Sequence, residues 1–225
     1  MKNKKDFFKK SDRYKPSTKK ETPKKAGKKE FSTSRQRTYT KETEPLLEQY
    51  KLSKGLIQIY TGDGKGKTCT VIGLTLRASG AGLKTGFFQF FKRPFSSEIK
   101  VLRELKNIHF YTFASHYYQS EYITKEEIKR FKADFKNVWK KTLSIIEKNS
   151  YDIIILDEIL VALRDGFLSE NELLDFIQNK NRTTELIITG RDITDKLTEV
   201  ADLITELKKI KHPFPDIKAR KGIDF

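Results

Sequence analysis

Two patterns of hydrophobic and polar positions alternate along the chain from about Gly55 onward. Short apolar, β-branched and aromatic runs are typical of buried strands, and the longer segments between them repeat apolar residues every three or four positions, as helices do. The predicted strands are Leu56–Thr61, Thr85–Phe91, Ile108–Ala114, Tyr151–Glu158 and Glu185–Gly190. The predicted helices are Thr68–Ser79, Ser97–Leu105, Thr124 to about Lys148, and one that begins after Ser169. This alternation predicts an α/β domain in which helices cover both faces of a mostly parallel sheet.

The starts of the two later helices carry the sequence of a capping box. Thr124 is followed by Glu127, and Ser169 by Glu172. In such a box, each of the two side chains accepts a hydrogen bond from the backbone N–H of the other residue. The segment Glu44–Gly55 is compatible with a further short helix ahead of the domain.

Positive charge is concentrated at the start of the chain. Residues 1–45 contain 16 Lys and Arg against 6 Asp and Glu, whereas the remaining 180 residues contain 30 against 24. The lysines, Ser, Thr and Pro of this first part predict a disordered basic tail at 1–45 and a folded domain at 46–225. The tail is either simply solvated or contacts RNA or anionic lipid weakly, because clustered lysines attract phosphate without a fold.

Cysteine content and hydropathy indicate the compartment. The single cysteine, Cys69, excludes an internal disulfide and fits a reducing cytoplasm. No apolar run approaches the roughly 20 residues of a membrane span. The basic start is not followed by the apolar stretch of a secretory signal. We therefore expect a cytoplasmic protein without a membrane partner.

The sequence between the first predicted strand and helix, GDGKGKT at Gly62–Thr68, has the composition of a phosphate-binding loop. The usual pattern G-x-x-x-x-G-K-[S/T] requires a glycine at position 61, where this chain has Thr61, so its first glycine comes one residue late. The glycines let backbone N–H groups surround phosphate oxygens at the positive end of the following helix. Lys67 would neutralise phosphate charge, and the Thr68 hydroxyl would bind Mg²⁺. A chance Gly- and Lys-rich turn is the alternative, and the flanking strand and helix argue against it.

Two other predicted strands end in charged residues at the edge of the sheet where parallel α/β domains bind ligands. Asp157 and Glu158 end a very apolar strand, and two carboxylates there are costly unless a cation such as phosphate-bound Mg²⁺ meets them. The alternative is an acid pair stabilised by the dipole of a following helix. Arg191 would hold a phosphate or carboxylate in a fork, or form a surface ion pair. These motifs predict a P-loop NTPase-like, three-layer domain that binds Mg·ATP, and they leave the reaction open.

Six segments, taken in order, resemble the P-loop type of ATP:corrinoid adenosyltransferases, from about Gly55 to Phe225. They are GLIQIYTGDGKGKTCTVIGLTLRASGAG, QFFK, IIILDEI, LIITGR, ADLITELKKIKHPF and IKARKGIDF. The short G-x-G-K-G-K-T loop and the closing KHPF…GIDF are far more specific to this family than a general phosphate-loop motif. The basic tail lies outside the resemblance.

The resemblance implies an activity and a set of site residues. ATP is bound in reversed orientation with its terminal phosphates in the loop, cobalt(I) of a reduced corrinoid attacks the ribose 5′ carbon, and inorganic triphosphate leaves. Lys67 and Glu158 are implied as catalytic, and Thr68, Asp157 and Glu158 as ligands of Mg²⁺ or Mn²⁺. The implied ATP-binding residues are Gly62, Asp63, Gly64, Lys65, Gly66, Lys67, Thr68, Arg77 and Arg191.

One stretch departs from the family pattern. After the third strand the family often has a glycine and a Phe-Thr-Trp-like sequence at the corrinoid pocket, where this chain has SHYYQSE at Ser115–Glu121. Tyr117 stands at the position of the phenylalanine, and the tryptophan has no counterpart. We expect Tyr117 and Tyr118 to contact the corrinoid; the alternative is that they are half-buried loop aromatics.

The resemblance also implies partners. It implies a homodimer in which the segment before the domain covers the partner's site, and an electron donor that supplies cobalt(I). The substrate is either cobalamin or a precursor such as cob(I)yrinic acid a,c-diamide. Two other functions stay open: an ATP-binding relative without corrinoid activity, and a nucleic-acid-associated ATPase that uses the basic tail. The mild charge of the domain argues against the second.

Overall fold

The structure is a computed structural model of the chain and describes residues 51–92, 96–113, 124–213 and 215–225. The tail predicted at 1–45 and its boundary with the domain lie outside the described residues. The described end of the predicted Glu44–Gly55 helix, residues 51–55, is not helical.

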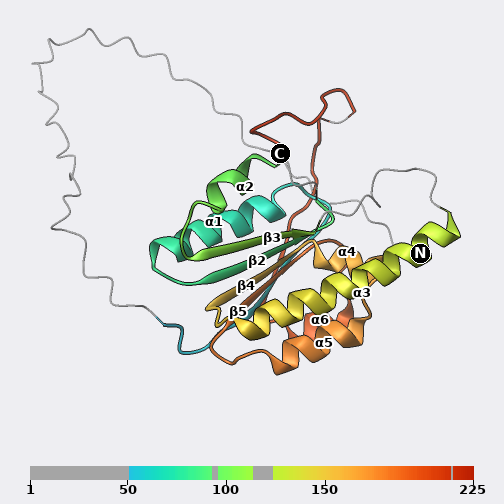
Figure 1. The fold of residues 1–225 in the computed structure, drawn as a ribbon. Coiled ribbons are helices and arrows are strands. Elements are labelled where there is room, and N and C mark those ends of the chain that lie inside the picture. Colours follow the sequence, from blue (N-terminus) through green and yellow to red (C-terminus); the bar gives the residue numbers. More distant parts are fainter. Residues whose placement is uncertain (1–50, 93–95, 114–123, 214) are drawn as a thin grey trace, which may run out of the picture. The chain divides into compact units, whose positions relative to one another are not determined.

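Six strands form one sheet, in which every described pair of neighbours is parallel (Figure 1). Their order across the sheet is β3-β2-β4-β5-β1-β6. The strands are β1 Ile57–Thr61, β2 Thr85–Phe90, β3 Ile108–Phe113, β4 Ile153–Asp157, β5 Glu185–Thr189 and β6 Leu203–Glu206. The predicted α/β class is confirmed, and the described sheet is wholly rather than mostly parallel.

The helices connect successive strands. They are α1 Lys67–Gly80, α2 Ser97–Leu102, α3 Lys125–Lys148, α4 Ile159–Arg164, α5 Glu170–Asn179 and α6 Asp195–Val200. Both capping boxes are confirmed, because the Thr124 and Ser169 hydroxyls accept from the N–H of Glu127 and Glu172. Helix α2 ends three residues before its predicted end, and α4 and α6 were not predicted. None of the described helices combines the length and apolarity needed to cross a membrane.

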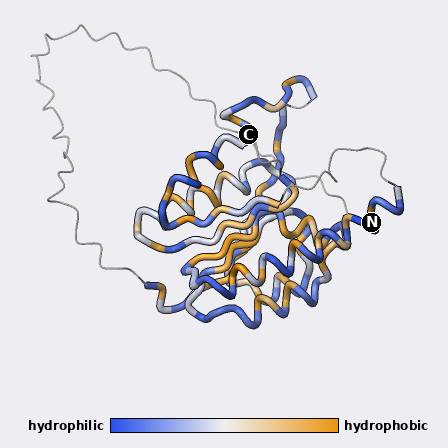
Figure 2. Tube along the Cα trace, viewed as in Figure 1, coloured by the Kyte–Doolittle hydropathy of each residue, from blue (hydrophilic) through white to orange (hydrophobic). Residues whose placement is uncertain are grey.

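Helices cover both faces of the sheet, because successive strand residues point to opposite sides. On one face Phe87 and Ile155 pack against Val71 of α1. On the other face Leu156 belongs to a larger core that includes Trp139 of α3 and several residues of α5 and α6. Figure 1 shows α1 and α2 on one side of the sheet and α3 and α5 on the other, and Figure 2 shows the hydrophobic strands between them. The predicted three-layer architecture is therefore confirmed.

Candidate functional site

The loop between β1 and α1 closes around the side chain of Lys67. This ammonium is buried and donates hydrogen bonds to the carbonyl oxygens of Gly62, at 2.7 Å, and Gly64, at 2.9 Å. Burial lowers the pKa of Lys67; the charge of Glu158 partly opposes this and that of Arg191 reinforces it. The loop thus holds one cation among its own backbone oxygens.

Two glycines of this loop lie against the backbone of Leu207. The Gly64 N–H donates to the Leu207 carbonyl oxygen at 2.7 Å, and the Leu207 N–H donates to the carbonyl of Thr61 at 2.9 Å. A Cβ at Gly62 or Gly64 would lie 2.4 or 2.6 Å from the Leu207 oxygen. Gly62 also has a φ of 102°, which L side chains rarely adopt. The late first glycine of the loop therefore permits a close contact with the chain that follows β6.

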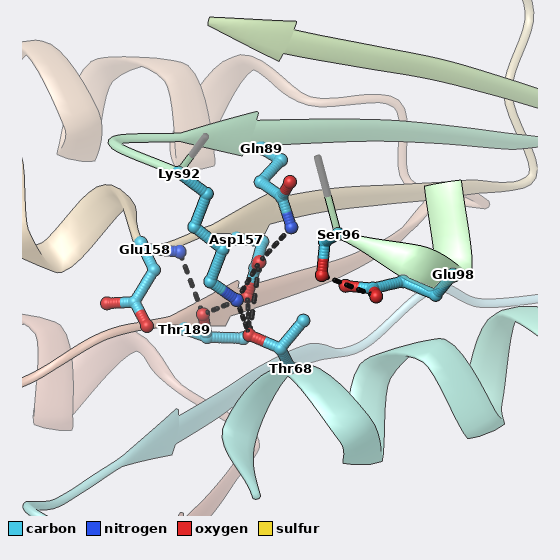
Figure 3. A network of polar contacts seen from close by, with 8 residues as sticks. All are labelled: Thr68, Gln89, Lys92, Ser96, Glu98, Asp157, Glu158 and Thr189. Carbon is cyan, nitrogen blue, oxygen red and sulfur yellow. Dashed lines mark hydrogen bonds and ion pairs between the residues drawn. The ribbon is translucent and has the colours of Figure 1, made fainter. Parts of the chain in front are cut away.

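Asp157 is the centre of a polar network at the end of β4 (Figure 3). Its side chain is fully buried, and its Oδ1 accepts from the hydroxyls of Thr189, at 2.8 Å, and Thr68, at 3.1 Å. Its Oδ2 accepts from Gln89 Nε2 at 3.0 Å and Lys92 Nζ at 3.2 Å. Lys92 Nζ also contacts the Thr68 hydroxyl. The carboxylate is thus satisfied by four surrounding side chains, and it fixes Thr68 at the start of α1.

Glu158 follows Asp157 in a left-handed conformation, with a φ of 66°. Its N–H donates to the Thr189 hydroxyl at 2.8 Å, and Figure 3 shows its carboxylate directed away from Asp157. Burial, and then the charge of Asp157, raise the pKa of Glu158, while the charges of Lys92 and Lys67 oppose this shift. The surroundings of the two neighbouring acids therefore differ: Asp157 is enclosed by side chains, and Glu158 is half-buried at the edge of a cavity.

Arg191 follows β5 at the same edge of the sheet. Gly190, with a φ of 147°, directs the chain out of the strand, and its N–H donates to the Tyr60 carbonyl at 3.2 Å. The Arg191 side chain is exposed, and its charge acts on both Lys67 and Glu158. The Arg191 guanidinium thus lies beside the glycine loop Gly62–Thr68.

The chain after β6 forms the opposite side of the site. The Asp63 carboxylate accepts from the Lys209 N–H at 3.0 Å, which lowers the pKa of Asp63. Lys65 forms an ion pair with Asp224, and Asp224 also accepts from the N–H of Arg220 at 2.8 Å. A cavity of about 380 Å³ lies between these parts. Its lining is residues 63–69, Lys92, Glu158, Arg191, His212, Pro213, residues 217–220 and Asp224.

Sequence comparisons identify the family. A family model described as ATP:corrinoid adenosyltransferase BtuR/CobO/CobP matches residues 53–225. This chain belongs to the ATP:corrinoid adenosyltransferase family. Enzymes of this family transfer the adenosyl group of ATP to a corrinoid.

Individual adenosyltransferases are similar over most of the chain. The corrinoid adenosyltransferase of Sinorhizobium sp is 35% identical over 176 residues, which cover 76% of this chain and 81% of that protein. Those of Pseudomonas aeruginosa and Escherichia coli K12 are each 28% identical and cover 80% and 85% of this chain and 88% and 96% of their own. Among solved structures, EssC (ATPases 2 and 3) from Geobacillus thermodenitrificans has a TM-score of 0.43 at 18% identity, over 73% of this chain and 33% of that one. A similarity that low supports no functional conclusion.

The structure brings together most of the site residues expected for an adenosyltransferase. Of the predicted ATP- and metal-binding residues, Asp63, Gly64, Lys65, Gly66, Lys67, Thr68, Glu158 and Arg191 line the cavity. Gly62 and Asp157 contact the residues that line it. Arg77 is exposed in the last turn of α1, ten residues after Lys67, or about 15 Å along the helix. Its assignment to the nucleotide stays a prediction. Tyr117 and Tyr118 lie outside the described residues.

Three polar residues of this candidate site were not predicted from the sequence. Gln89, Lys92 and Thr189 all contact Asp157. Gln89 is a polar residue near the end of the mostly apolar strand β2, Lys92 follows the end of that strand, and Thr189 ends β5. Position at a strand end was thus a usable signal, because parallel strands place their carboxyl ends at one edge.

The oxygen atoms at this edge suit the divalent ion expected for an adenosyltransferase. Within the described ranges no cluster of three or more His, Cys, Asp or Glu residues can hold a metal alone. Thr68, Asp157 and Glu158 nevertheless supply the hydroxyl and carboxylate oxygens that Mg²⁺ prefers, and phosphates complete its shell in nucleotide sites. The Lys92 ammonium already contacts Thr68 and Asp157, so their oxygens accommodate a cation. The residues therefore fit the ion.

Proposed function

We propose that this protein transfers the 5′-deoxyadenosyl group of ATP to cobalt(I) of a reduced corrinoid and releases inorganic triphosphate. The observation that carries the proposal is the shared cavity, into which the phosphate loop, Glu158 and Arg191 all face. The family match supports adenosyl transfer from ATP, and this arrangement supports a site for the triphosphate part of ATP.

In the proposed complex the terminal phosphates of ATP lie in the loop. Helix α1 begins at Lys67, and its N-cap residue Gly66 provides no side-chain cap, so the N–H groups of its first turn are available to phosphate oxygens. The Lys67 ammonium would exchange the carbonyls of Gly62 and Gly64 for phosphate oxygens, which are stronger acceptors because they are charged. Arg191 would bind the phosphate chain from the β5 side.

Thr68 and Glu158 would hold Mg²⁺ or Mn²⁺, with Asp157 fixing the Thr68 hydroxyl by its hydrogen bond. When bound, the ion supplies positive charge that stabilises the departing triphosphate. Asp157 is too enclosed by its four partners to move freely, and we assign it the orientation of Thr68.

The proposed reaction is a displacement at the ribose 5′ carbon. The electron pair of cobalt(I) forms the cobalt–carbon bond, and cobalt becomes formally cobalt(III). The bond from the 5′ carbon to the α-phosphate oxygen breaks, and its electron pair leaves with triphosphate. No side chain has to transfer a proton in this step, so the protein aligns the two reactants and holds the leaving charge with Lys67, Arg191 and backbone N–H groups.

The proposal extends to the setting of the enzyme. We propose a cytoplasmic homodimer whose corrinoid substrate is reduced to the cobalt(I) state by a separate electron donor, with the segment before the domain covering the partner's site. Light scattering of a chain shortened to begin near Gly55 tests the role of that segment. An unchanged dimer would remove it from the interface.

The reaction is tested with purified protein, chemically reduced cob(I)alamin and Mg·ATP under anaerobic conditions. We expect a light-sensitive cobalt–carbon product and an equal amount of triphosphate, measured by ion chromatography. Triphosphate is diagnostic because an ATPase or kinase breaks a bond between phosphates and leaves ADP. ADP with no alkylated corrinoid would reject the proposal. Alkylation of a precursor and not of cobalamin would keep the reaction and change the substrate.

A further inference from the structure

The Lys92 ammonium, just after the end of β2, lies beside the oxygen atoms where a metal ion is expected. Figure 3 shows its ammonium group between the Asp157 carboxylate and the Thr68 hydroxyl. It lies 3.2 Å from Asp157 Oδ2 and contacts Thr68 Oγ1 directly. The proposed function assigns Thr68 to the metal and Asp157 to the orientation of the Thr68 hydroxyl. A divalent ion and an ammonium group repel each other at such short range, so the two cations cannot share these oxygens.

The backbone before Lys92 is held in a conformation that a large side chain rarely adopts. Phe91 has a φ of 54°, in the left-handed region, where such residues are uncommon outside functional sites. Its ring stacks on Phe135, with centroids 5.3 Å apart and planes at 5°, and lies 5.8 Å from the ring of Phe167. Aromatic packing on the α3 side of the sheet therefore supports the turn that places Lys92 beside Asp157.

The Lys92 side chain is free to change partners, whereas Asp157 is not. Lys92 is 30% exposed and Asp157 is 0% exposed. Lys92 lines the 380 Å³ cavity and also a neighbouring cavity of about 770 Å³ on the α1 side. If its ammonium moved into the cavity, Asp157 would keep its hydrogen bonds to Thr189 and Gln89. The long flexible stem of lysine allows such a movement without any change in the backbone.

We propose that Lys92 is the counter-cation of the Thr68–Asp157 pair in the nucleotide-free enzyme, and that it transfers to the phosphate chain when metal and ATP bind. This inference rests on the proposed phosphate and metal sites. Lys92 then excludes free divalent ions until phosphates draw its ammonium away, so the metal enters together with the nucleotide. Because binding linkage is reciprocal, the metal in turn strengthens the contact between Lys92 and the phosphates.

The test measures binding and not turnover, with the full chain. Free Mn²⁺ is followed by its electron paramagnetic resonance signal as protein is added without nucleotide. We expect Lys92→Gln to bind Mn²⁺ at least about tenfold more tightly than the unaltered protein, because a competing unit charge is removed at short range. Lys100→Gln is the matched control: it removes the same charge from an exposed position on α2 that lines neither cavity. It should leave the affinity for Mn²⁺ unchanged.

A second titration examines the transfer of Lys92 to the phosphate chain. Calorimetry with tripolyphosphate in EDTA should show about tenfold weaker binding to Lys92→Gln, because the ammonium contact with phosphate is lost. Unchanged Mn²⁺ affinity would overturn the counter-cation role, and unchanged tripolyphosphate affinity would overturn the transfer to phosphate. If circular dichroism shows that Lys92→Gln does not fold, Lys92→Met keeps the length of the stem and replaces it in both titrations.

The same measurements separate this inference from the proposed reaction. A rise in Mn²⁺ affinity in a protein that does not alkylate corrinoid would support the role of Lys92 and reject the adenosyl transfer. Adenosyl transfer with no change in either titration would support the reaction and reject the role of Lys92. If the unaltered protein binds no tripolyphosphate, both the phosphate site and the inference that rests on it are rejected.

Discussion

The cavity at the phosphate loop has two walls that are built in different ways. The wall formed by the ends of β2, β4 and β5 contains fully buried polar groups, and its central carboxylate, Asp157, accepts hydrogen bonds from four side chains. The wall formed by the chain after β6 is exposed at every described residue from 208 to 225. It contacts the loop through the backbone of Leu207 and through surface ion pairs such as Lys65–Asp224.

The difference predicts which wall determines the chemistry. Interactions between buried groups are weakly screened, and removal of one partner leaves another unsatisfied, so the strand-end wall is rigid. Exposed ion pairs contribute little and weaken in salt, so the other wall closes the site without holding it in shape. Substitutions in the first wall should therefore abolish function or stability, and those in the second should only modulate them.

The largest effect is expected at Lys67, which lies at the end of the glycine loop, between the two walls. Lys67→Ala should lower the rate of adenosyl transfer by about a hundred- to a thousandfold, because it removes the charge proposed to stabilise the departing triphosphate. The fold should survive, since the hydrogen bonds of the ammonium within the described residues go to the carbonyls of Gly62 and Gly64 in the loop itself. Single-turnover kinetics measure the rate, and circular dichroism checks the fold.

Lys65→Ala is the matched control for that change. Lys65 lies in the same loop but points to the exposed wall, where it pairs with Asp224. Its loss should lower the rate by less than about tenfold, as expected for an exposed ion pair. A Lys67→Ala enzyme that keeps a rate within a few-fold of the unaltered protein would reject the phosphate-loop assignment.

The next largest effect is expected from the two neighbouring acids, which should respond differently. Asp157→Asn leaves the Lys92 ammonium without its buried carboxylate partner, and we expect the free energy of unfolding to fall by about 2–4 kcal/mol. Glu158→Gln removes a carboxylate that faces the cavity, so stability should change by less than about 1 kcal/mol. Urea denaturation of both variants measures this contrast.

The rate of adenosyl transfer should also distinguish Glu158 from Asp157. Glu158→Gln should impair Mg²⁺-dependent transfer more than ATP binding, with the largest deficit at limiting Mg²⁺, because it weakens the proposed metal ligand. Rates over a Mg²⁺ titration, with ATP affinity measured in parallel, test this expectation. If neither quantity changed, the metal role would belong to Asp157 and not to Glu158.

The sequence predicted the strand-end wall far better than the exposed wall. Apolar runs marked β1, β4 and β5, and the charged residues at their ends lie beside the glycine loop as parallel topology requires. The contact between Lys92 and Asp157 could not be predicted, because it depends on the left-handed turn at Phe91. A strand pattern specifies which residues are buried, and it does not specify the dihedral angles just beyond its end.

Other features escaped the sequence analysis for different reasons. Helices α4 and α6 span six residues each, less than two turns, so neither shows a helical period. The contact of Leu207 with Gly62 and Gly64 involves backbone atoms, which leave no signature in side-chain identity. Only the resemblance to a family marks the KHPF…GIDF terminus, because no hydrophobic or charge pattern within it indicates a partner.

The smallest effect is expected at Asp224, in the exposed wall. Hydrogen bonds from Lys65 and Arg220 hold the pKa of Asp224 well below its ordinary value of 3.8. A lowered pKa means that the detached segment takes up a proton more readily than the docked one. The contribution of Asp224 to docking is therefore present above about pH 4 and is lost as the pH falls below 3.8 toward the lowered value.

Hydrogen exchange at the Arg220 amide, which donates to Asp224 at 2.8 Å, reports whether the hydrogen bonds of this carboxylate are formed. Its protection, corrected for the intrinsic dependence of exchange on pH, should fall as the pH drops below 4, and it should also fall in high salt at neutral pH. Asp224→Asn should remove both dependences and lower the kcat/KM for adenosyl transfer by less than about fivefold, because the pair is exposed. A hundredfold loss of kcat/KM in this variant would mean that the exposed wall contributes to catalysis as strongly as the strand ends do, and the contrast between the two walls would be wrong.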